Sequence, residues 1–268
     1  MSENLIQING SGLFSKGEVS ISILKGKANS GITFEVNGSE ISADLKNVSN
    51  ANRNTVLSNG KESICLVEHF LATCSIFSVD DIRVITNCNE LVFEDGSAMH
   101  WQNLFEENNF SGKIERKYQL SKAIFLKNND KSIAALPSTV FKVSYLLDYD
   151  NSVIGKLFAT WTKRDAKEKL TKARTFAKKE ENKFFSAQDK LLSFDENGFD
   201  KPLNDPLEPA YHKILDIIGD LRLIGINPLE INMHVIGIKS GHAMNIEIAR
   251  EIKGVIAKSA SNKATSIV

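Results

Sequence analysis

Alternating and periodic apolar positions predict two successive sets of strands and helices along the chain. The first set contains an alternating stretch with an Asn-Ser-Gly turn, then an apolar run, two short strand-like runs and a further helical segment. These elements are strands at 17–34, a helix at 66–78, strands at 81–86 (DIRVIT) and 91–94 (LVFE), and a helix that Asp95 or Ser97 would cap.

The second half of the chain repeats this order. Its elements are a strand at 138–149, a charged, partly helical segment at 162–185, a helix at 211–225, a strand at 229–238 and a helix at 242–257. In both halves a turn of small residues, Gly96-Ser97 or Ser240-Gly241, precedes the last helix. We therefore predict an α+β fold of two similar domains, 1–112 and 113–268, that face each other across a cleft.

Composition and charge narrow the class of protein. Apolar residues make up 42% and charged residues 25% of the 268 residues, which suits a folded chain with a sizeable core. Lys plus Arg and Asp plus Glu both number 33, and this zero net charge argues against non-specific nucleic-acid binding. The start, MSENLIQING, lacks the parts of a signal peptide, and no apolar run is long enough to span a bilayer.

Cysteine usage predicts a reducing compartment. Cys65, Cys74 and Cys88 are too few and too scattered for a disulfide framework, and they lack the CxxC spacing of a thiolate zinc site. The cytoplasm is the simplest location for such a chain.

The helix at 211–225 carries a polar stripe that its apolar character does not explain. Residues four apart lie on one side of a helix, and here they are His212, Asp216 and Asp220. This spacing lets His212 and Asp216 bind one metal ion from adjacent turns, although taken alone it is more typical of a surface ion pair. The surrounding isoleucines and leucines favour the metal site, because a carboxylate against an apolar surface is costly unless it is paired or metal-bound.

The dipeptide Glu68-His69 lies near the start of the helix predicted at 66–78. Its simplest interpretation is a glutamate stabilised by the helix dipole beside a packed histidine. If His69 meets His212 and Asp216 in space, however, two histidines and one aspartate form a zinc site whose fourth position is open to water. Glu68 would then lie where a general base can take a proton from that water.

His242 follows a Ser-Gly turn at the start of the last predicted helix. Its default interpretation is a histidine of the helix cap, and the alternative is a general acid. The helix dipole lowers the pKa of such a ring, whereas a nearby carboxylate such as Asp220 raises it and keeps the ring protonated. His100 and His234 show no partner pattern, so we interpret both as structural.

The order of several segments is typical of one enzyme family. The chain opens with GSGLFSKGEVSISILKGKANSGITF and continues with VEHFLATCSIFSVDDIRV, FEDGSA, KARTF, HKILDIIGDL and KSGHAMN. In this order and spacing the segments resemble the UDP-3-O-acyl-N-acetylglucosamine deacetylase family of lipid A biosynthesis, over most of the chain. The resemblance implies a zinc-dependent hydrolase of the bacterial cytoplasm that releases acetate from the glucosamine nitrogen of an acylated UDP-sugar. It also implies two related α+β domains, with helices packed between two sheets and the active site in the cleft between the domains.

The resemblance also assigns roles to individual residues. It implies three zinc ligands, a general base and a general acid, a residue that orients the acid, an oxyanion donor, and contacts to the diphosphate and to the sugar or acyl group. In that order these are His69, His212 and Asp216; Glu68 and His242; Asp220; Thr175; and Lys213 and Phe176. We expect a monomer with no nucleic-acid partner and no integral membrane segment.

The chain departs from the family's pattern in two places. Phe14 stands where the opening motif usually has a histidine, so any role of that side chain is lost. The segment Ala177–Phe194 is shorter and more charged than the family's glycine-rich segment after ARTF, which leaves acyl recognition open. This segment is the only support for an alternative substrate, another N-acylated sugar nucleotide. A non-catalytic binding protein is a third interpretation, but it predicts loss of the acid and the base, and Glu68 and His242 are both present.

Overall fold

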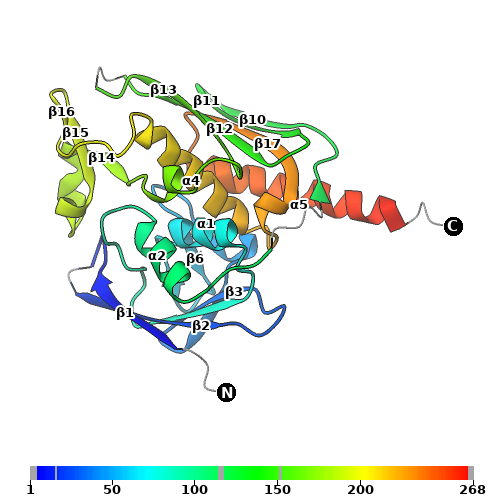
Figure 1. Cartoon of the computed structure of the whole chain (residues 1–268), viewed down its shortest axis with the longest axis horizontal. Coiled ribbons are helices and arrows are strands. Elements are labelled where there is room, and N and C mark those ends of the chain that lie inside the picture. Colours follow the sequence, from blue (N-terminus) through cyan, green and yellow to red (C-terminus); the bar gives the residue numbers. More distant parts are fainter. Residues whose placement is uncertain (1–4, 16, 114–117, 151–152, 265–268) are drawn as a thin grey trace.

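Two main β-sheets lie on opposite sides of the central helices in the computed structural model, which describes residues 5–15, 17–113, 118–150 and 153–264 (Figure 1). The first sheet has the order β1-β2-β8-β3-β4, and its neighbours are antiparallel except for the parallel pair β3 and β8. Its strands are β1 (Ile6–Ser11), β2 (Glu18–Lys25), β3 (Ile32–Val36), β4 (Ser39–Ser42) and β8 (Ile82–Thr86).

The second sheet has the order β10-β11-β17-β12-β13, with β12 and β17 parallel and the other neighbours antiparallel. A short strand, β9, pairs in parallel with the start of β17. The strands are β9 (Tyr118–Gln119), β10 (Ile124–Asn128), β11 (Lys131–Pro137), β12 (Lys142–Asp148), β13 (Lys156–Thr162) and β17 (Ile231–Ile238).

Helices and small sheets complete the described chain. The α-helices are α1 (Glu68–Phe77), α2 (Met99–Glu107), α3 (Glu168–Thr171), α4 (Glu208–Arg222) and α5 (His242–Ala264). The 3-10 helices are η1 (Leu45–Asn47), η2 (Lys179–Phe184), η3 (Gln188–Lys190) and η4 (Pro228–Glu230). Two small sheets contain β5 (Val48–Asn50), β6 (Val56–Ser58) and β7 (Ser63–Ile64), and β14 (Phe176–Lys178), β15 (Leu192–Asp195) and β16 (Gly198–Phe199). Within the described ranges no helix is both long and apolar enough to cross a membrane.

The two main sheets have the same strand order and the same pattern of pairing. In each sheet the central strand, β8 or β17, comes last in the sequence and lies between two antiparallel pairs. This strand is parallel to one neighbour and antiparallel to the other. A parallel neighbour requires a crossover, and the crossover contains a helix each time, α1 or α4. Another helix, α2 or α5, follows the inserted strand. The prediction of an α+β fold with two similar units is therefore confirmed, while the boundary near residue 112 stays a prediction.

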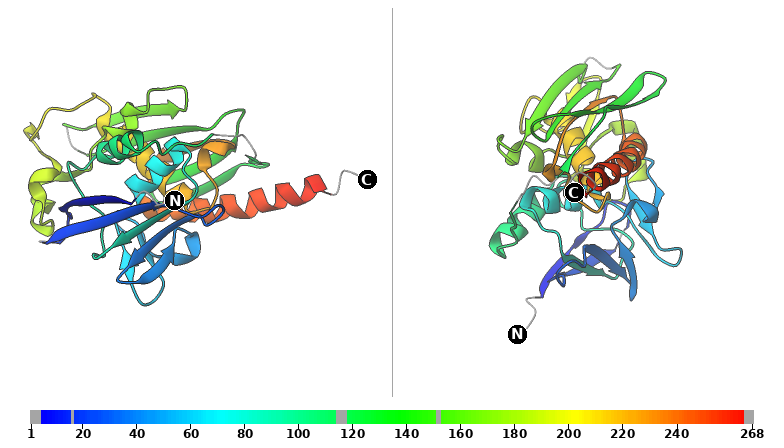
Figure 2. Two further views of the ribbon diagram at one scale, coloured as in Figure 1. Left: turned by 60° about the horizontal axis from the view of Figure 1, so that its bottom comes forward. Right: turned by 90° about the vertical axis from the view of Figure 1, so that its right-hand side faces the viewer.

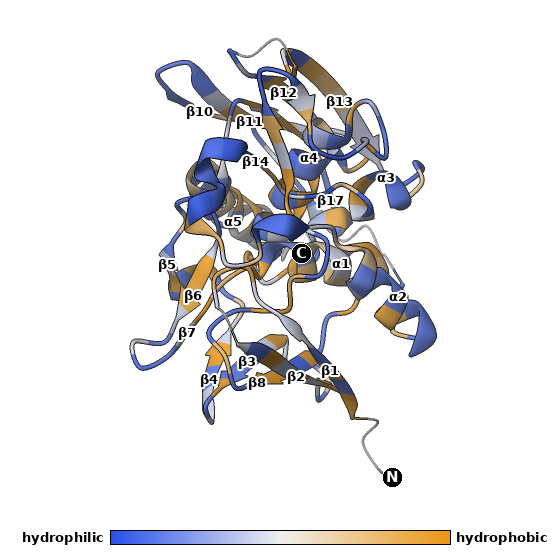
Figure 3. Ribbon diagram, turned by 90° about the vertical axis from the view of Figure 1, so that its left-hand side faces the viewer, coloured by the Kyte–Doolittle hydropathy of each residue, from blue (hydrophilic) through white to orange (hydrophobic). Residues whose placement is uncertain are grey.

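The central helices belong to one apolar core that reaches both sheets. α4 packs on β12 and β13, α5 packs on β10 and β11, and α1 packs against α4 (Figure 2). Phe70 of α1 meets the Trp101 ring at 5.0 Å and the Phe105 ring at 5.9 Å, which ties α1 to α2. Hydrophobic residues, orange in Figure 3, lie along the strands of the sheets and along the helices between them. The contact between α1 and α4 is thus fixed by packing from both sides.

The prediction of a strand at 91–94 is wrong. Only Glu90, just before it, makes an isolated bridge with Cys65. Leu91, Val92 and Phe93 are all buried in an irregular segment, in which Phe93 N–H donates to Ser11 O. The run is apolar because it is enclosed by other elements, and such a run need not form a ladder.

The predicted cap of the helix after Ser97 also needs correction. The N-cap of α2 is Ala98, which offers no side-chain cap, although Ser97 Oγ accepts the Met99 N–H at 3.1 Å. The charged segment at 162–185 is partly helical, as predicted: it contains the four-residue helix α3 and the 3-10 helix η2, with strand β14 between them.

Candidate active site

Helices α1 and α4 approach closely where α1 begins. A Cβ atom at Gly219 of α4 would lie 2.0 Å from the carbonyl oxygen of Glu68, so only glycine fits this contact. The approach places Glu68 and His69 beside the polar stripe of α4. Nearly every residue of α4 is buried, including His212, Asp216 and Asp220 of that stripe. The stripe is therefore an interhelical contact and not a solvated face.

His69, His212 and Asp216 come together at this contact and are all buried. The two histidine Nε2 atoms are 3.2 Å apart, and Asp216 Oδ1 lies 3.5 Å from His69 Nε2 and 3.6 Å from His212 Nε2. A tetrahedral ion with bonds of about 2.0–2.1 Å holds its ligand atoms about 3.3 Å apart, so the triangle fits Zn²⁺. The donors also fit, since two imidazoles and a carboxylate are the ligand types of open zinc sites.

The electrostatics of the cluster favour metal binding. Burial lowers the pKa of His212 well below its ordinary value, so the imidazole is neutral. Burial raises the pKa of Asp216, but the neighbouring imidazoles and the Lys213 ammonium offset this and bring it well below its ordinary value. A neutral imidazole and a charged carboxylate are the forms that bind metal. His212 Nδ1 has no hydrogen-bond partner in the described ranges, whereas the second nitrogen of a ligand histidine usually has one.

The two predicted substrate contacts border the metal cluster. Lys213 Nζ donates to Asp216 Oδ2 at 2.9 Å and lies 5.6 Å from the Phe176 ring centroid. The Phe176 ring in turn meets the His212 ring edge-on, with centroids 5.5 Å apart. Lys213 is thus engaged by a carboxylate of the cluster, and its contact with a diphosphate stays a prediction, as does the contact of Phe176 with the sugar or acyl group.

Glu68 and His242 flank the cluster. Glu68 Oε1 lies 4.0 Å from His242 Nε2, and the same nitrogen lies 3.8 Å from Asp216 Oδ2. Burial raises the pKa of the Glu68 carboxyl, and the neighbouring imidazoles lower it less. A carboxylate with a raised pKa is suited to accept a proton near neutral pH.

Asp220 holds the ring of His242. His242 Nδ1 and Asp220 Oδ2 are 2.8 Å apart, and Asp220 is fully buried. Burial lowers the pKa of His242, but the carboxylates of Asp220 and Asp216 more than offset this and raise it to about 9. The carboxylate effect expected from the sequence therefore outweighs the effect of burial on this ring.

The ARTF motif borders the cluster, since Thr175 lines a small cavity together with Glu68 and His69. Thr175 Oγ1 donates to Gly96 O at 3.0 Å, so its hydroxyl must rotate before it can serve a substrate oxyanion. The preceding residue, Arg174, anchors the motif through a two-bond ion pair, with Nε 2.7 Å from Glu208 Oε1 and Nη2 3.0 Å from Glu208 Oε2. Glu208 is the first residue of α4, so this pair fixes Thr175 relative to the helix that carries His212.

We expect Glu208→Ala to destabilise the fold by about 2–3 kcal/mol, because the largely buried Arg174 side chain loses its charged partner and keeps only its bond to Pro202 O. Denaturant unfolding measures this change. Lys178→Ala is the matched control, since the Lys178–Glu180 pair is 3.8 Å apart with side chains 51% and 76% exposed, and loss of an exposed pair costs about 1 kcal/mol or less. Equal effects of the two substitutions would contradict the anchoring role of Glu208.

Other residues near the site were given no role from the sequence. Thr55 donates to Asp220 at 2.5 Å, and Asn245, the last residue of the KSGHAMN segment, donates to it at 2.9 Å. His100, interpreted as structural, lines a small cavity together with Glu68, His69 and Thr175. Burial lowers the pKa of His100 to about 3, and neither ring nitrogen has a hydrogen-bond partner in the described ranges. Thr55 and His100 lie far along the chain from Asp220 and from the metal cluster's α4 residues, so no local pattern reveals them.

His234 lies away from the cluster, on a strand of the second sheet. Its Nε2 is 2.9 Å from Ser144 Oγ, and Ser144 Oγ is 2.8 Å from Thr160 Oγ1. These contacts join β17, β12 and β13 and agree with the structural interpretation of His234.

The charged segment Ala177–Phe194 folds against the N-terminal loop. The backbone N–H groups of Ser186 and Ala187 donate to Leu13 O, and the Phe14 and Phe185 rings lie 5.9 Å apart. A small apolar cluster forms between the segment and this loop, from Leu13, Phe93, Ala177 and Leu191. Phe14 therefore has a packing role at the position where the family usually has a histidine.

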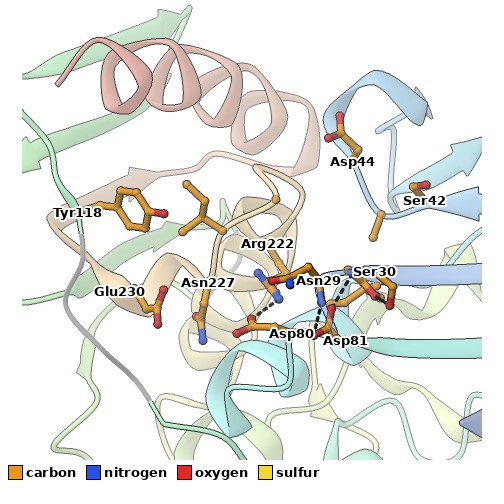
Figure 4. Close-up of a pocket in the computed structure, with 15 residues that line it drawn as sticks. Asn29, Ser30, Ser42, Asp44, Asp80, Asp81, Tyr118, Arg222, Asn227 and Glu230 are labelled. Carbon is orange, nitrogen blue, oxygen red and sulfur yellow. Dashed lines mark hydrogen bonds and ion pairs between the residues drawn. The ribbon is translucent and has the colours of Figure 1, made fainter. Parts of the chain in front are cut away.

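A separate cavity lies at the other end of α4 (Figure 4). It has a volume of about 500 Å³ and is lined by Arg222, which pairs with Asp80 at 2.6 Å, and by further carboxylates of both halves. Ten residues separate Arg222 from His212, about 15 Å along a helix. This cavity is larger than the one beside the cluster, but it contains no histidine and no candidate base and acid pair.

Comparison with known proteins gives one consistent result. The family model described as UDP-3-O-acyl N-acetylglycosamine deacetylase matches residues 3–254. A UDP-3-O-acyl-N-acetylglucosamine deacetylase of Chlamydia abortus is 29% identical, over 94% of this chain and 95% of the relative. Proteins of the same name are 32% identical in Chlamydia trachomatis serovar L2 and 30% identical in Chlamydia muridarum, each over 84% of both chains.

Proposed function

Since the chain belongs to the UDP-3-O-acyl N-acetylglycosamine deacetylase family, we propose that it performs this deacetylation at a zinc ion held by His69, His212 and Asp216. The reaction is hydrolysis of the N-acetyl group of UDP-3-O-acyl-N-acetylglucosamine in lipid A biosynthesis. The observation that supports the zinc proposal is the triangle of ligand atoms at 3.2, 3.5 and 3.6 Å, which matches the edges of a tetrahedral site.

When bound, zinc would lower the pKa of water and polarise the amide carbonyl. Glu68 is the proposed base, and it takes a proton from the water oxygen that attacks the amide carbon. The carbonyl oxygen gains negative charge in that step, and the Thr175 hydroxyl turns from Gly96 O to stabilise it.

His242 is the proposed acid. It gives a proton to the amide nitrogen as the C–N bond breaks, so that acetate and a free amine result. Asp220, 2.8 Å from His242 Nδ1, orients the ring so that Nε2 faces Glu68 and Asp216. Lys213 and Phe176 are the proposed contacts to the diphosphate and to the sugar or acyl group.

We further propose that the protein acts as a monomer in the bacterial cytoplasm. The fold of a single chain brings His69, His212 and Asp216 together, and free cysteines are typical of a reducing compartment. Light scattering of the purified protein tests the monomer, and a dimer mass at working concentration would contradict it.

The decisive experiment is an acetate-release assay on UDP-3-O-acyl-N-acetylglucosamine, with and without a chelator. We expect release that stops when zinc is removed and resumes when zinc is restored. The charged segment Ala177–Phe194 keeps a second candidate open, another N-acylated sugar nucleotide. A specificity constant higher for a substrate without the 3-O-acyl chain would favour that candidate.

The pH profile tests the assignment of base and acid. We assign the acid limb to Glu68, whose pKa burial raises above its ordinary value. The pKa of His242 is raised from 6.5 to about 9, and a bound dication at Asp216 lowers it again, so we expect the alkaline limb between these two values. His242→Ala should keep its metal, and its residual activity should lose the alkaline limb; an unchanged limb would remove His242 from the acid role.

The segment Ala177–Phe194 predicts a partly open acyl groove. Lys178, Lys179 and Glu180 are exposed, and Phe184 is 56% exposed, so this part of the segment does not enclose a chain. Full burial contributes roughly 0.8 kcal/mol for each methylene, and an open groove contributes less. We expect the specificity constant to rise by less than this increment per methylene, measured with 3-O-acyl chains of increasing length below micelle formation. A full increment at every step would contradict the open groove.

A further inference from the structure

The carboxylate of Asp220 has a hydrogen-bond partner that the proposed mechanism does not use. Its Oδ2 atom accepts from His242 Nδ1 at 2.8 Å and from Asn245 Nδ2 at 2.9 Å. Its other oxygen, Oδ1, accepts from the hydroxyl of Thr55 at 2.5 Å. Both Asp220 and Thr55 are fully buried. Without Thr55, the Oδ1 atom would lose this partner in a place where water does not replace it.

Thr55 also contacts the proposed base and the proposed acid. Its backbone N–H donates to Glu68 Oε2 at 3.4 Å, and its Oγ1 lies 3.5 Å from His242 Nδ1. Thr55 stands just before β6 in the first half of the chain, whereas Asp220 and His242 belong to α4 and α5 of the second half. One residue of the first half thus touches the base, the acid and the residue that orients the acid.

We propose that Thr55 is a positioning residue, which fixes the Asp220–His242 pair relative to Glu68. The hydroxyl bond to Oδ1 restricts rotation of the Asp220 carboxylate, so that Oδ2 stays directed at His242 Nδ1. The His242 ring is then held with Nε2 toward the substrate side, near Glu68 and Asp216. A misdirected acid or base costs turnover more than binding, because proton transfer requires hydrogen-bond geometry in the transition state. This inference rests on the proposed acid and base roles.

Thr55→Val tests the proposal, because it removes the hydroxyl and keeps the side-chain shape. We expect kcat to fall by about tenfold to a hundredfold, with KM and metal content unchanged. Thr55→Ser is the matched control, since it keeps the hydroxyl and loses the methyl, and we expect it to retain most of kcat. If Thr55→Val does not fold, Thr55→Ala removes the hydroxyl without placing a methyl against the carboxylate.

A second measurement does not depend on activity. The Nδ1 nitrogen of His242 lies 2.8 Å from Asp220 Oδ2, so we expect its proton to give a strongly downfield NMR signal. We expect Thr55→Val to shift or broaden this signal and Thr55→Ser to preserve it. Wild-type kcat in Thr55→Val, or equal losses in the Val and Ser variants, would overturn the proposal, as would an unchanged Nδ1 signal. If the wild type released no acetate at all, the proposed function would fail, while the NMR signal would still test the positioning role.

Discussion

We expect His212→Ala to purify without zinc and to lose roughly three or more orders of magnitude in kcat. The metal contributes several kcal/mol to the transition state, and each 1.36 kcal/mol corresponds to a factor of ten in rate. Removing the imidazole leaves only His69 and Asp216 from a triangle whose edges fit a tetrahedral ion. Metal analysis of the purified variant, together with the acetate-release assay, measures both effects.

Two further measurements distinguish a metal ligand at His212 from a histidine with a purely structural role. His234→Ala is the control, because His234 bonds to Ser144 on the second sheet, away from the cluster, and should keep full zinc content. His212→Ala should also keep its fold, since burial of this imidazole is costly and its Nδ1 has no partner in the described ranges. A His212→Ala variant with one zinc per chain would show that the ligand assignment is wrong.

The polar stripe of α4 could be predicted from sequence because its physical signal is local. Spacing of four places His212, Asp216 and Asp220 on one side, and the apolar neighbours indicate that this side is buried. The order of elements likewise indicated two similar units, which the matching strand orders of the two sheets confirm. Periodicity and element order can be predicted from the sequence because each depends on residues that are close together in the chain.

Residues held by long-range contacts could not be predicted in this way. Thr55 and Asp220 are 165 positions apart, and Arg174 and Glu208 are 34 apart, so nothing near either pair indicates the other member. The role of Gly219, whose missing side chain permits the approach of α1, likewise depends on a distant helix. The prediction of a strand at 91–94 was wrong for a related reason. An irregular segment that other elements enclose is as apolar as a buried strand.

Glu68→Gln should keep its zinc and lose roughly 10²–10⁴-fold in kcat, the contribution typical of a general base. The amide has nearly the shape of the carboxylate, and its oxygen can still accept the N–H of Thr55, which is 3.4 Å from Glu68 Oε2. It cannot take a proton from water. KM should change little, since Glu68 is not a proposed substrate contact.

The fold should tolerate this substitution well. Burial raises the pKa of Glu68, which means that the site disfavours the charged form, and a neutral amide avoids that cost. We therefore expect the unfolding free energy of Glu68→Gln to equal or exceed that of the wild type, so low activity cannot be attributed to loss of folded protein. Glu106→Gln, near the end of α2, is the control: it should leave zinc and kcat unchanged and cost about 1 kcal/mol or less of stability, since it removes only a partly exposed ion pair with Lys167. If Glu68→Gln instead lost its zinc, Glu68 would belong to the ligand set, and if it kept kcat within tenfold of the wild type, another group would have to accept the proton of the attacking water.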